Sequence, residues 1–189
     1  MILGVCNFMD ENVKIEKFKI NYLKEVKRIY NEAFPIEERM SLKLLIFNLI
    51  RKCELYVLFE NNRICGFTYL INHKDMTFIL YLAIDKTKRG KGYGGYILDW
   101  CSRYKKDKVI YLNIDELNDK FSDIEIRKKR LKFYTLHSFK LTDYLSVEEK
   151  CNFNILVKNG EFDYNNYIKL DERIAKIFFD KKSNIKKVT

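Results

Sequence analysis

Three apolar segments in succession, separated by short polar turns, constrain the fold of this chain most strongly. Residues 55–60 (LYVLFE), 64–71 (ICGFTYLI) and 77–84 (TFILYLAI) are rich in β-branched and aromatic side chains, which favour strands. The polar connections 61–63 and 73–75 are of the length that joins two strands in a hairpin. We therefore predict an antiparallel meander at the centre of the fold.

Helical and extended hydrophobic periods alternate on both sides of this meander. We predict strands over 13–20, 109–114, 139–144 and 152–157, and helices from Asn21, from near Ser41, after Gly92, over 124–136 and over 165–179. This order is typical of a mixed sheet with helices on both faces, in the α/β or α+β class. A length of 189 residues fits a single domain over 1–189, with 1–12 as a loose leader and 160–189 as a C-terminal helix and basic tail.

Composition narrows the class further. Hydrophobic residues make up 47% of the chain, aromatic residues 15%, and the formal net charge is +10, which excludes disordered and collagen-like chains. No apolar run approaches the ~18 residues that cross a bilayer, and the first eight residues lack the pattern of a secretory signal. Met9 is an alternative start. The five cysteines and two histidines have no metal-ligand spacing, so we expect free thiols, no metal and a cytoplasmic protein.

The segment 81–95 (YLAIDKTKRGKGYGG) carries the strongest chemical signal. An apolar strand ends at Asp85, a basic loop follows, and glycines at 90, 92, 94 and 95 open a helix. Glycines let a ligand approach the backbone, and the N–H groups of a helix start favour an anion. Four cations surround the same place: Lys86, Lys88, Arg89 and Lys91. The segment therefore predicts a phosphate or pyrophosphate site.

Two known phosphate-binding loops do not fit this segment. A P-loop needs Ser or Thr after Gly-Lys, whereas Gly92 follows Gly90-Lys91. The dinucleotide pattern GxGxxG is formally matched by Gly90, Gly92 and Gly95, with Asp115 twenty residues further on. In that fold, however, the first glycine follows the strand directly, and the motif opens the domain instead of following hairpins.

The pattern Arg89-x-x-Gly92-x-Gly94 resembles the pyrophosphate-binding signature of the GNAT superfamily of N-acetyltransferases. The strand 81–85 resembles the bulged strand of that family, and 133–139 (FYTLHSF) resembles a second family element in which Ser138 replaces a glycine. Together these similarities cover roughly residues 55–144. They imply the GNAT fold, a mixed and mostly antiparallel central sheet flanked by helices, with acetyl-CoA as co-substrate.

The resemblance also implies roles for individual residues. The backbone around Leu82, Ala83 and Ile84 is expected to pair with the pantetheine arm, and one N–H there to stabilise the oxyanion. The pyrophosphate is expected to lie on Arg89, Gly90, Lys91, Gly92, Tyr93, Gly94 and Gly95. Tyr134 matches the family tyrosine near the sulfur, and a phenol is protonated at neutral pH and can donate to a departing thiolate.

The general base is left open. Family members that use a carboxylate on the strand after the glycine loop would place it near Asn113, which takes up no proton. Asp115 and Glu38 are candidates, as are their neighbours Glu116 and Glu37, and a solvent chain is the alternative. The acceptor is expected to be a primary amine of an unidentified small molecule or peptide. An acidic lip of these carboxylates and Asp119 would suit a cationic amine.

Other functions compete with this interpretation. A CoA-binding module without turnover is compatible with Asn113, and the basic runs 127–132 and 181–187 invite a nucleic-acid interpretation. A helix that turns Ile126, Leu131 and Phe133 inward explains the first run without a nucleic acid, and the family resemblance offers the alternative that part of this run faces the 3′-phosphate of CoA. No recognition motif accompanies either run. The apolar side of the terminal helix would dock on the sheet or on a second subunit, which leaves a homodimer open, and no membrane partner is expected.

Overall fold

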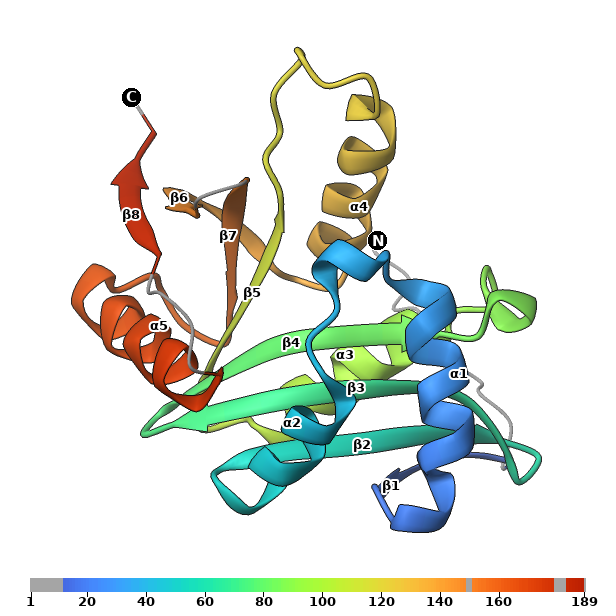
Figure 1. The fold of residues 1–189 in the computed structure, drawn as a ribbon. Helices are drawn as coiled ribbons and strands as arrows, with labels where there is room; N and C mark the ends of the chain where they lie inside the picture. Colours follow the sequence, from blue (N-terminus) through green and yellow to red (C-terminus); the bar gives the residue numbers. More distant parts are fainter. Residues whose placement is uncertain (1–11, 149–150, 179–182, 189) are drawn as a thin grey trace, which may run out of the picture.

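The computed structural model describes residues 12–148, 151–178 and 183–188. Their central feature is an eight-stranded sheet with helices on both faces (Figure 1). The strands are β1 (Val13–Lys17), β2 (Cys53–Glu60), β3 (Arg63–His73), β4 (Met76–Ile84), β5 (Val109–Asp115), β6 (Lys140–Val147), β7 (Asn152–Lys158) and β8 (Asn184–Lys187). The α-helices are α1 (Leu23–Ala33), α2 (Leu42–Phe47), α3 (Tyr93–Tyr104), α4 (Ile124–Leu136) and α5 (Tyr164–Phe178). Short 3-10 helices are η1 (Ile20–Tyr22), η2 (Ile36–Glu38), η3 (Asn48–Ile50) and η4 (Lys86–Lys88).

The strand order is β1-β2-β3-β4-β5-β7-β6-β8, and all neighbours are antiparallel except β4 and β5. The predicted mixed, mostly antiparallel sheet is therefore confirmed. The first strand is shorter than expected because η1 begins at Ile20, and the second helix is completed by η3. In the predicted basic tail, β8 pairs with the outer edge of β6 and adds a strand that the sequence pattern did not indicate.

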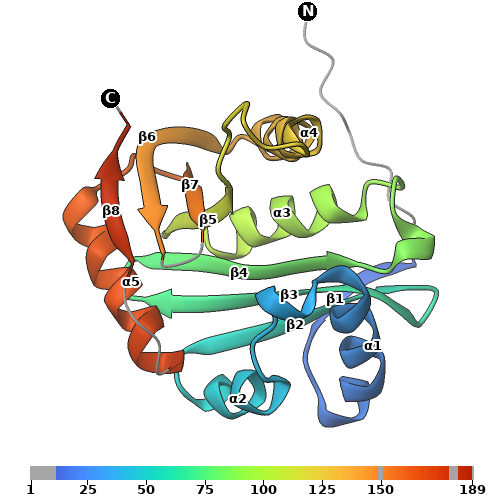
Figure 2. The ribbon, with the colours of Figure 1, turned by 45° about the horizontal axis from the view of Figure 1, so that its top comes forward.

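The sheet separates two hydrophobic layers. Helices α3 and α4 cover one face, and α1, α2 and α5 cover the other (Figure 2). Alternation along β2 shows how this arises, because Leu55 and Val57 pack with the α1 side while Tyr56 and Leu58 pack with the α3 side. Strands buried on both faces explain the nearly continuous apolar runs of the meander.

Strands β4 and β5 separate after a short parallel contact. They pair only where Met76–Phe78 lies beside Val109–Tyr111, and β5 then continues along β7 as far as Asp115. The β3–β4 register shifts by one residue between Tyr69 and Leu70, which leaves Leu80 as a bulge residue on β4. The rest of β4 therefore has β3 on one side and diverges from β5 on the other (Figure 1).

Helix α4 corrects one expectation. Ile126 was predicted to face inward, but it is 61% exposed. The inward line of the helix instead runs through Arg127, Leu131 and Tyr134, at the helical spacing of three to four residues. Arg127 lies with its guanidinium carbon 3.9 Å from the ring centre of Phe121. Leu131 and Phe133 are partly buried, as expected.

Helix α5 docks on the sheet through an apolar stripe of its own chain. Tyr167, Leu170, Ile177 and Phe178 are buried in the layer that also holds α1. Within the described ranges, we find no helix whose length and apolar character would let it span a bilayer.

Candidate functional site

The glycine loop forms the start of α3. Gly90 and Gly92 have φ angles of 78° and 84°, in the left-handed region that glycine adopts without strain. Gly92 is the N-cap of α3, and its carbonyl accepts the first helical hydrogen bond from the Tyr96 N–H at 3.0 Å. The N–H groups of the first turn before Tyr96 have no acceptor within the helix. Because Gly90–Gly92 is exposed, this helix start is open to an anion.

The next two glycines make room for α4. A Cβ on Gly94 would lie 3.1 Å from Cζ of Phe133, and a Cβ on Gly95 would lie 2.3 Å from the ring of His137. Nδ1 of His137 lies 3.2 Å from the Asp99 carboxylate of α3. Gly94 and Gly95 therefore let α4 pack against the first turn of α3. The sequence pattern alone could not show whether Gly94 and Gly95 permit this helix packing or contact a cofactor.

Asp85 anchors the loop between β4 and α3. Its carboxylate accepts hydrogen bonds from the Thr87 N–H at 2.8 Å and the Thr87 hydroxyl at 2.6 Å, and it forms an ion pair with Arg28 of α1. The Thr87 hydroxyl and Arg28 together lower the pKa of Asp85 to about 2, although burial acts in the opposite direction. The loop is thus tied to both β4 and α1.

The four cations of the loop are not equally available. Lys88 forms an ion pair with Glu60 at the β2–β3 turn, and Tyr93 donates its hydroxyl proton to the same carboxylate. Arg89 is exposed and donates from Nε to the Ile84 carbonyl at 3.2 Å. Lys86 and Lys91 are exposed, and neither has an ion-pair partner in the described part of the chain. Two lysines and the outer face of Arg89 therefore supply the positive charge at the helix start.

A second cluster brings together the three residues predicted for catalysis. Desolvation and the charge of Asp115 raise the pKa of Glu38 in η2, and Arg130 of α4 opposes this shift. Burial raises the pKa of Tyr134, with Arg130 and Asp115 as the nearby charges. Arg130 itself forms an ion pair with Asp115 at the end of β5. Residues from η2, β5 and α4 therefore share one electrostatic environment.

Tyr134 lies between aromatic side chains and leaves its hydroxyl available. Its ring centre is 5.1 Å from that of Phe133 and 5.9 Å from that of Phe139. Within the described ranges, its hydroxyl has no hydrogen-bond partner. Ser138, which stands where the family motif has a glycine, adopts φ 62°, in the left-handed region that glycine favours at the end of a helix.

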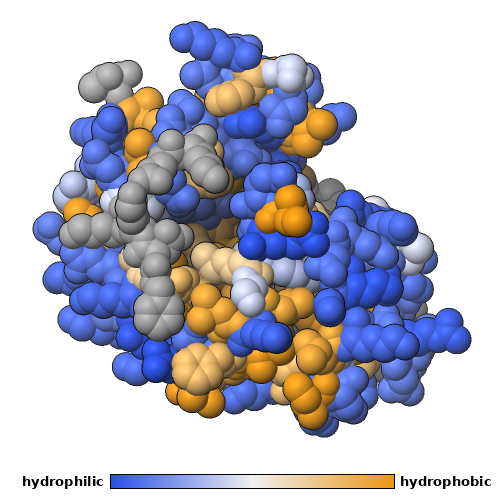
Figure 3. All heavy atoms as spheres, in the orientation of Figure 1, coloured by the Kyte–Doolittle hydropathy of each residue, from blue (hydrophilic) through white to orange (hydrophobic). Residues whose placement is uncertain are grey.

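The surface is hollowed beside this cluster, between β5 and the connection from α1 to α2 (Figure 3). Tyr81 of β4 fixes that connection, because its hydroxyl donates to the Glu38 carbonyl at 2.9 Å and accepts from the Met40 N–H at 3.2 Å. The hydroxyl of Tyr30 donates to the Met40 carbonyl at 3.1 Å. Glu38 is therefore held over the diverging part of β4.

Two of the five carboxylates of the expected acidic lip pair with the basic run of α4. Asp115 pairs with Arg130, and Asp119 lies 3.3 Å from the Lys128 ammonium. Glu116 accepts a hydrogen bond from the Asn152 side chain at 3.0 Å. The basic run thus compensates Asp115 and Asp119, which leaves Glu37 and Glu38 as the carboxylates that would favour a cationic amine.

Asn113 faces α5 instead of the hollow. The buried hydroxyl of Tyr167 donates to its side-chain oxygen at 2.9 Å. A neutral acceptor suits this place, because an unpaired carboxylate beside a buried phenol would be desolvated at high cost. Sequence reasoning missed Arg28 and Arg130 as site residues, since their carboxylate partners lie 57 and 15 residues away and no local pattern marks such pairs.

Strands β4 and β5 diverge, β4 leads to a helix that opens with glycines, and the following helix carries a tyrosine. These features are those of the class of protein that the sequence resemblance indicates. Residues 51–141 match the family model described as the acetyltransferase (GNAT) domain. Residues 51–141 therefore form a GNAT acetyltransferase domain, and the resemblance drawn from the motifs is confirmed.

Similar proteins agree with this result. Over 110 residues the chain is 30% identical to "Putative acetyltransferase YjbC" of Bacillus subtilis (strain 168); the aligned part covers 58% of this chain and 54%, about half, of that relative. A GNAT-family structure from Bacteroides thetaiotaomicron has a TM-score of 0.73 at 20% identity, covering 89% of this chain and 99% of the other. Naa50 of Arabidopsis thaliana, solved with the bisubstrate analogue CoA-Ac-MVNAL, has a TM-score of 0.58 at 20% identity, covering 80% and 99%. Structures this distant in sequence establish the shared fold.

Proposed function

We propose that the protein transfers an acetyl group from acetyl-CoA to a primary amine by direct attack in a ternary complex. The observation that carries this proposal is the separation of β4 from β5, which leaves one edge of β4 leading to the exposed start of α3. A long ligand with a diphosphate at one end fits such a path, because strand groups pair with its amides and a helix start binds its charge. The acceptor is an unidentified small molecule or peptide.

The proposed cofactor-binding residues lie along β4 and at the start of α3. Leu82, Ala83 and Ile84 lie on β4 beyond the bulge, where their backbone faces the pantetheine arm and one N–H stabilises the oxyanion. The diphosphate rests on Gly90, Lys91 and Gly92 and on the first turn of α3, which contains Tyr93, Gly94 and Gly95, with Arg89 at its edge. Acetyl-CoA supplies the reactive thioester, and the fit of this path to its shape supports it as the co-substrate.

Two side chains complete the chemistry. Tyr134 donates its proton to the departing sulfur as the C–S bond breaks, and its raised pKa keeps it protonated at neutral pH. Glu38 accepts the proton that the amine loses as the new C–N bond forms. The raised pKa of Glu38 brings it nearer to the operating pH, whereas Asp115 is engaged by Arg130 and acts here through its charge. A solvent chain is the alternative route for the amine proton.

The proposal is tested by incubating the protein with acetyl-CoA and a panel of amines and measuring free thiol. We expect amine-dependent thiol release. Binding of acetyl-CoA without any thiol release would favour the second candidate, a CoA-binding module without turnover. Asn113 supports that candidate, because it stands near the strand position where some family members have a carboxylate base. No binding at all would refute both functions.

The base is tested by the pH dependence of the rate. Because the pKa of Glu38 is raised, it loses its proton at higher pH than an ordinary glutamate, and the acidic limb of the profile should follow this loss. Glu38→Gln should lower the rate about a hundredfold and remove that limb. Glu37→Gln is the matched control and should leave the limb in place. An unaltered limb in Glu38→Gln would favour the solvent chain.

We also propose that the protein is cytoplasmic. Cys53, Cys65, Cys101 and Cys151 are free thiols, and the first three are buried. Unpaired buried thiols are typical of reducing compartments. A homodimer stays a prediction that a sedimentation measurement would test.

A further inference from the structure

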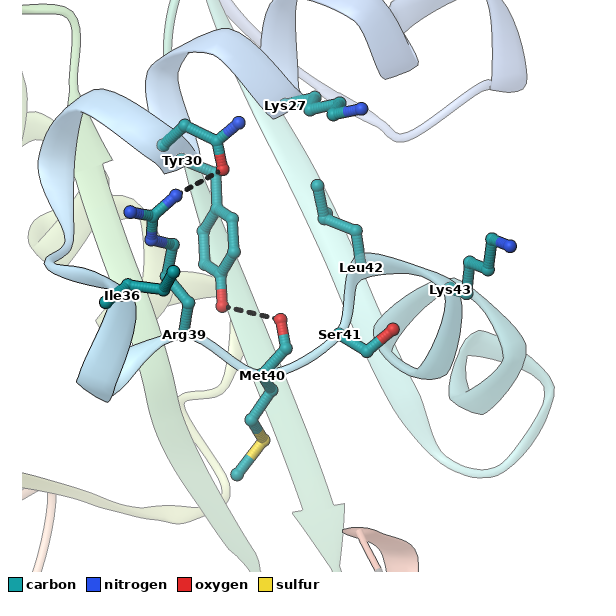
Figure 4. Close-up of a pocket in the computed structure, with 9 residues that line it drawn as sticks. Lys27, Tyr30, Ile36, Arg39, Met40, Ser41, Leu42 and Lys43 are labelled. Carbon is teal, nitrogen blue, oxygen red and sulfur yellow. Dashed lines mark hydrogen bonds between the residues drawn. The ribbon is translucent and has the colours of Figure 1, made fainter.

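An open cavity of 470 Å³ lies between α1 and α2, next to the connection that carries Glu38 (Figure 4). The two helices form its sides, and the connection between them contributes the rest of its wall. Its lining residues are Lys27, Tyr30, Asn31, Ile36, Arg39, Met40, Ser41, Leu42 and Lys43. The predicted cofactor residues of β4 and α3 are absent from this lining, so the cavity is distinct from the path along β4.

The charge around this cavity is one-sided. Lys27, Arg39 and Lys43 line it together with no acidic residue. Within residues 12–148, 151–178 and 183–188, none of the three has an ion-pair partner. The next residue on α1 behaves differently, because Arg28 pairs with Glu25, Glu32 and Asp85. The three cavity cations, from α1, the connection and α2, are thus left uncompensated, whereas Arg28 of α1 has three carboxylate partners.

Arg39 has a single side-chain hydrogen bond at the edge of this cavity. Its Nη1 donates to the side-chain oxygen of Asn31 at 2.9 Å, and its Nε is buried without a partner. Unpaired buried donors are rare in folded proteins because they lose their hydration without replacement. A guanidinium with one side-chain bond and one unpaired donor can turn towards an acceptor that enters the cavity, and its planar fork suits carboxylate and phosphate groups.

Apolar side chains provide the rest of the surface. The ring of Tyr30 is buried at the back, Met40 and Leu42 are partly exposed, and Ile36 is 72% exposed. A ligand that combines an anion with a compact apolar or aromatic body would satisfy both kinds of wall.

From these observations we infer that the cavity between α1 and α2 binds a small molecule through a carboxylate or phosphate group. This inference goes beyond the proposed acetyl transfer and does not require it. The anion has two sources, an acid group on the amine acceptor or a separate small ligand. Either would sit against Arg39, the neighbour of Glu38 in the chain.

Benzoate and phenyl phosphate are suitable probes, with neutral benzamide as the matched control ligand. Their binding is followed through the backbone amide NMR signals of the whole chain in the presence of excess CoA, so that the signals of Gly90–Gly94 report separately on the helix start. We expect the two anions to shift the signals of Lys27 and of residues 39–43, and benzamide to shift them far less.

Three single variants test the assignment. Arg39→Gln and Lys43→Gln should each weaken binding about tenfold, the loss expected for one charge-assisted contact. Lys24→Gln removes an exposed lysine of the same helix outside the cavity and should leave the affinity unchanged. Far-ultraviolet circular dichroism checks that the variants fold. Because Lys43 is exposed, Lys43→Gln is expected to fold and keeps the test valid if Arg39→Gln does not. Anion binding that is absent, or equal in all variants, would overturn the inference.

Two amine acceptors, one with and one without an acid group, distinguish the two possible sources of the anion. If the anion belongs to the acceptor, 4-(aminomethyl)benzoate should be acetylated with a lower KM than benzylamine, and Arg39→Gln should remove the difference. If the anion is a separate ligand, the two amines should have equal KM values while benzoate still binds. Both results support the cavity as an anion site, whereas a lower KM for benzylamine without benzoate binding would contradict it.

Discussion

The loop that leads into α3 and the helix α4 that covers it are held in different ways. The loop is fixed by Asp85, which bonds twice to Thr87 and pairs with Arg28, and by Lys88, which pairs with Glu60. Helix α4 has no fully buried residue, and it is held by the partly buried side chains of Leu131, Phe133 and Tyr134 together with ion pairs between partly exposed side chains. Surface ion pairs contribute little to stability, whereas a buried and fully bonded carboxylate contributes more. We therefore expect the proposed cofactor side to be firm and the side around the proposed acceptor site to be more adjustable.

Gly92→Glu should have the largest effect on this firm side. The substitution places a carboxylate at a helix start proposed to hold a diphosphate, and it forces a φ of 84° on a residue with a Cβ. We expect the affinity for acetyl-CoA, measured by calorimetry, to fall about a hundredfold or more. Gly92→Asn is the control, because asparagine tolerates left-handed φ without adding charge, and it should keep the affinity within about tenfold. Near-normal affinity in Gly92→Glu would remove the diphosphate from this loop.

Tyr134→Phe probes the adjustable side and should act on the rate instead of on binding. Loss of the proton donor should lower turnover about a hundredfold, while the KM for acetyl-CoA changes less than about threefold. Steady-state kinetics with saturating amine measures both. Tyr144→Phe is the control: this ring stacks on Phe162, its centre 4.6 Å away, and the change should leave turnover intact. Equal turnover in the wild type and Tyr134→Phe would make Tyr134 a packing residue only.

Asp85→Asn measures how firmly the loop is held. Asp85 has a lowered pKa and so stabilises the fold when it is ionised, above its unfolded pKa of 3.8, and this contribution is lost as the pH falls towards about 2. Because the side chain is 8% exposed, we expect the free energy of unfolding at pH 7 to drop by about 2 kcal/mol, measured in urea. The difference from the wild type should shrink between pH 4 and pH 2.

The control for Asp85 shares the same arginine. Glu32 lies 3.2 Å from Arg28, but both side chains are about a third exposed, so Glu32→Gln should change the free energy of unfolding by less than about 0.5 kcal/mol. Equal losses in the two variants would show that the loop is no firmer than the surface of α1.

The difference between the two regions also explains which features could be predicted from the sequence and which could not. Helix 23–33 and the three-strand meander follow from local hydrophobic periods, and the glycine loop is a local motif with its own physical signature. Strand β8 was missed because 184–187 (NIKK) has a single apolar residue, and its pairing with β6 arises only in the tertiary fold. Ion pairs across 57 residues, such as Arg28 with Asp85, leave no local pattern at all.

The candidate site shows the same limit. Tyr134, Asp115 and Glu38 were proposed from a motif and from chain position, and the structure places them in one environment, but their catalytic roles stay predictions. The pairing of Arg130 could not be predicted, because a run of basic residues does not reveal which member meets a carboxylate. Only the fold shows that Asp115 and Asp119 of the acidic lip pair with the basic run of α4.

Ile126 offers the smallest and most direct check of the α4 side. Its side chain is 61% exposed, so Ile126→Ser should change the free energy of unfolding by less than about 0.5 kcal/mol, while Leu131→Ala on the inward line should cost about 1–2 kcal/mol. Urea unfolding of both variants measures the contrast. A loss at Ile126 as large as that at Leu131 would mean that α4 is rotated so that Ile126 faces the sheet. That rotation would also move Tyr134 away from Asp115, and the proposed proton donor would be lost with it.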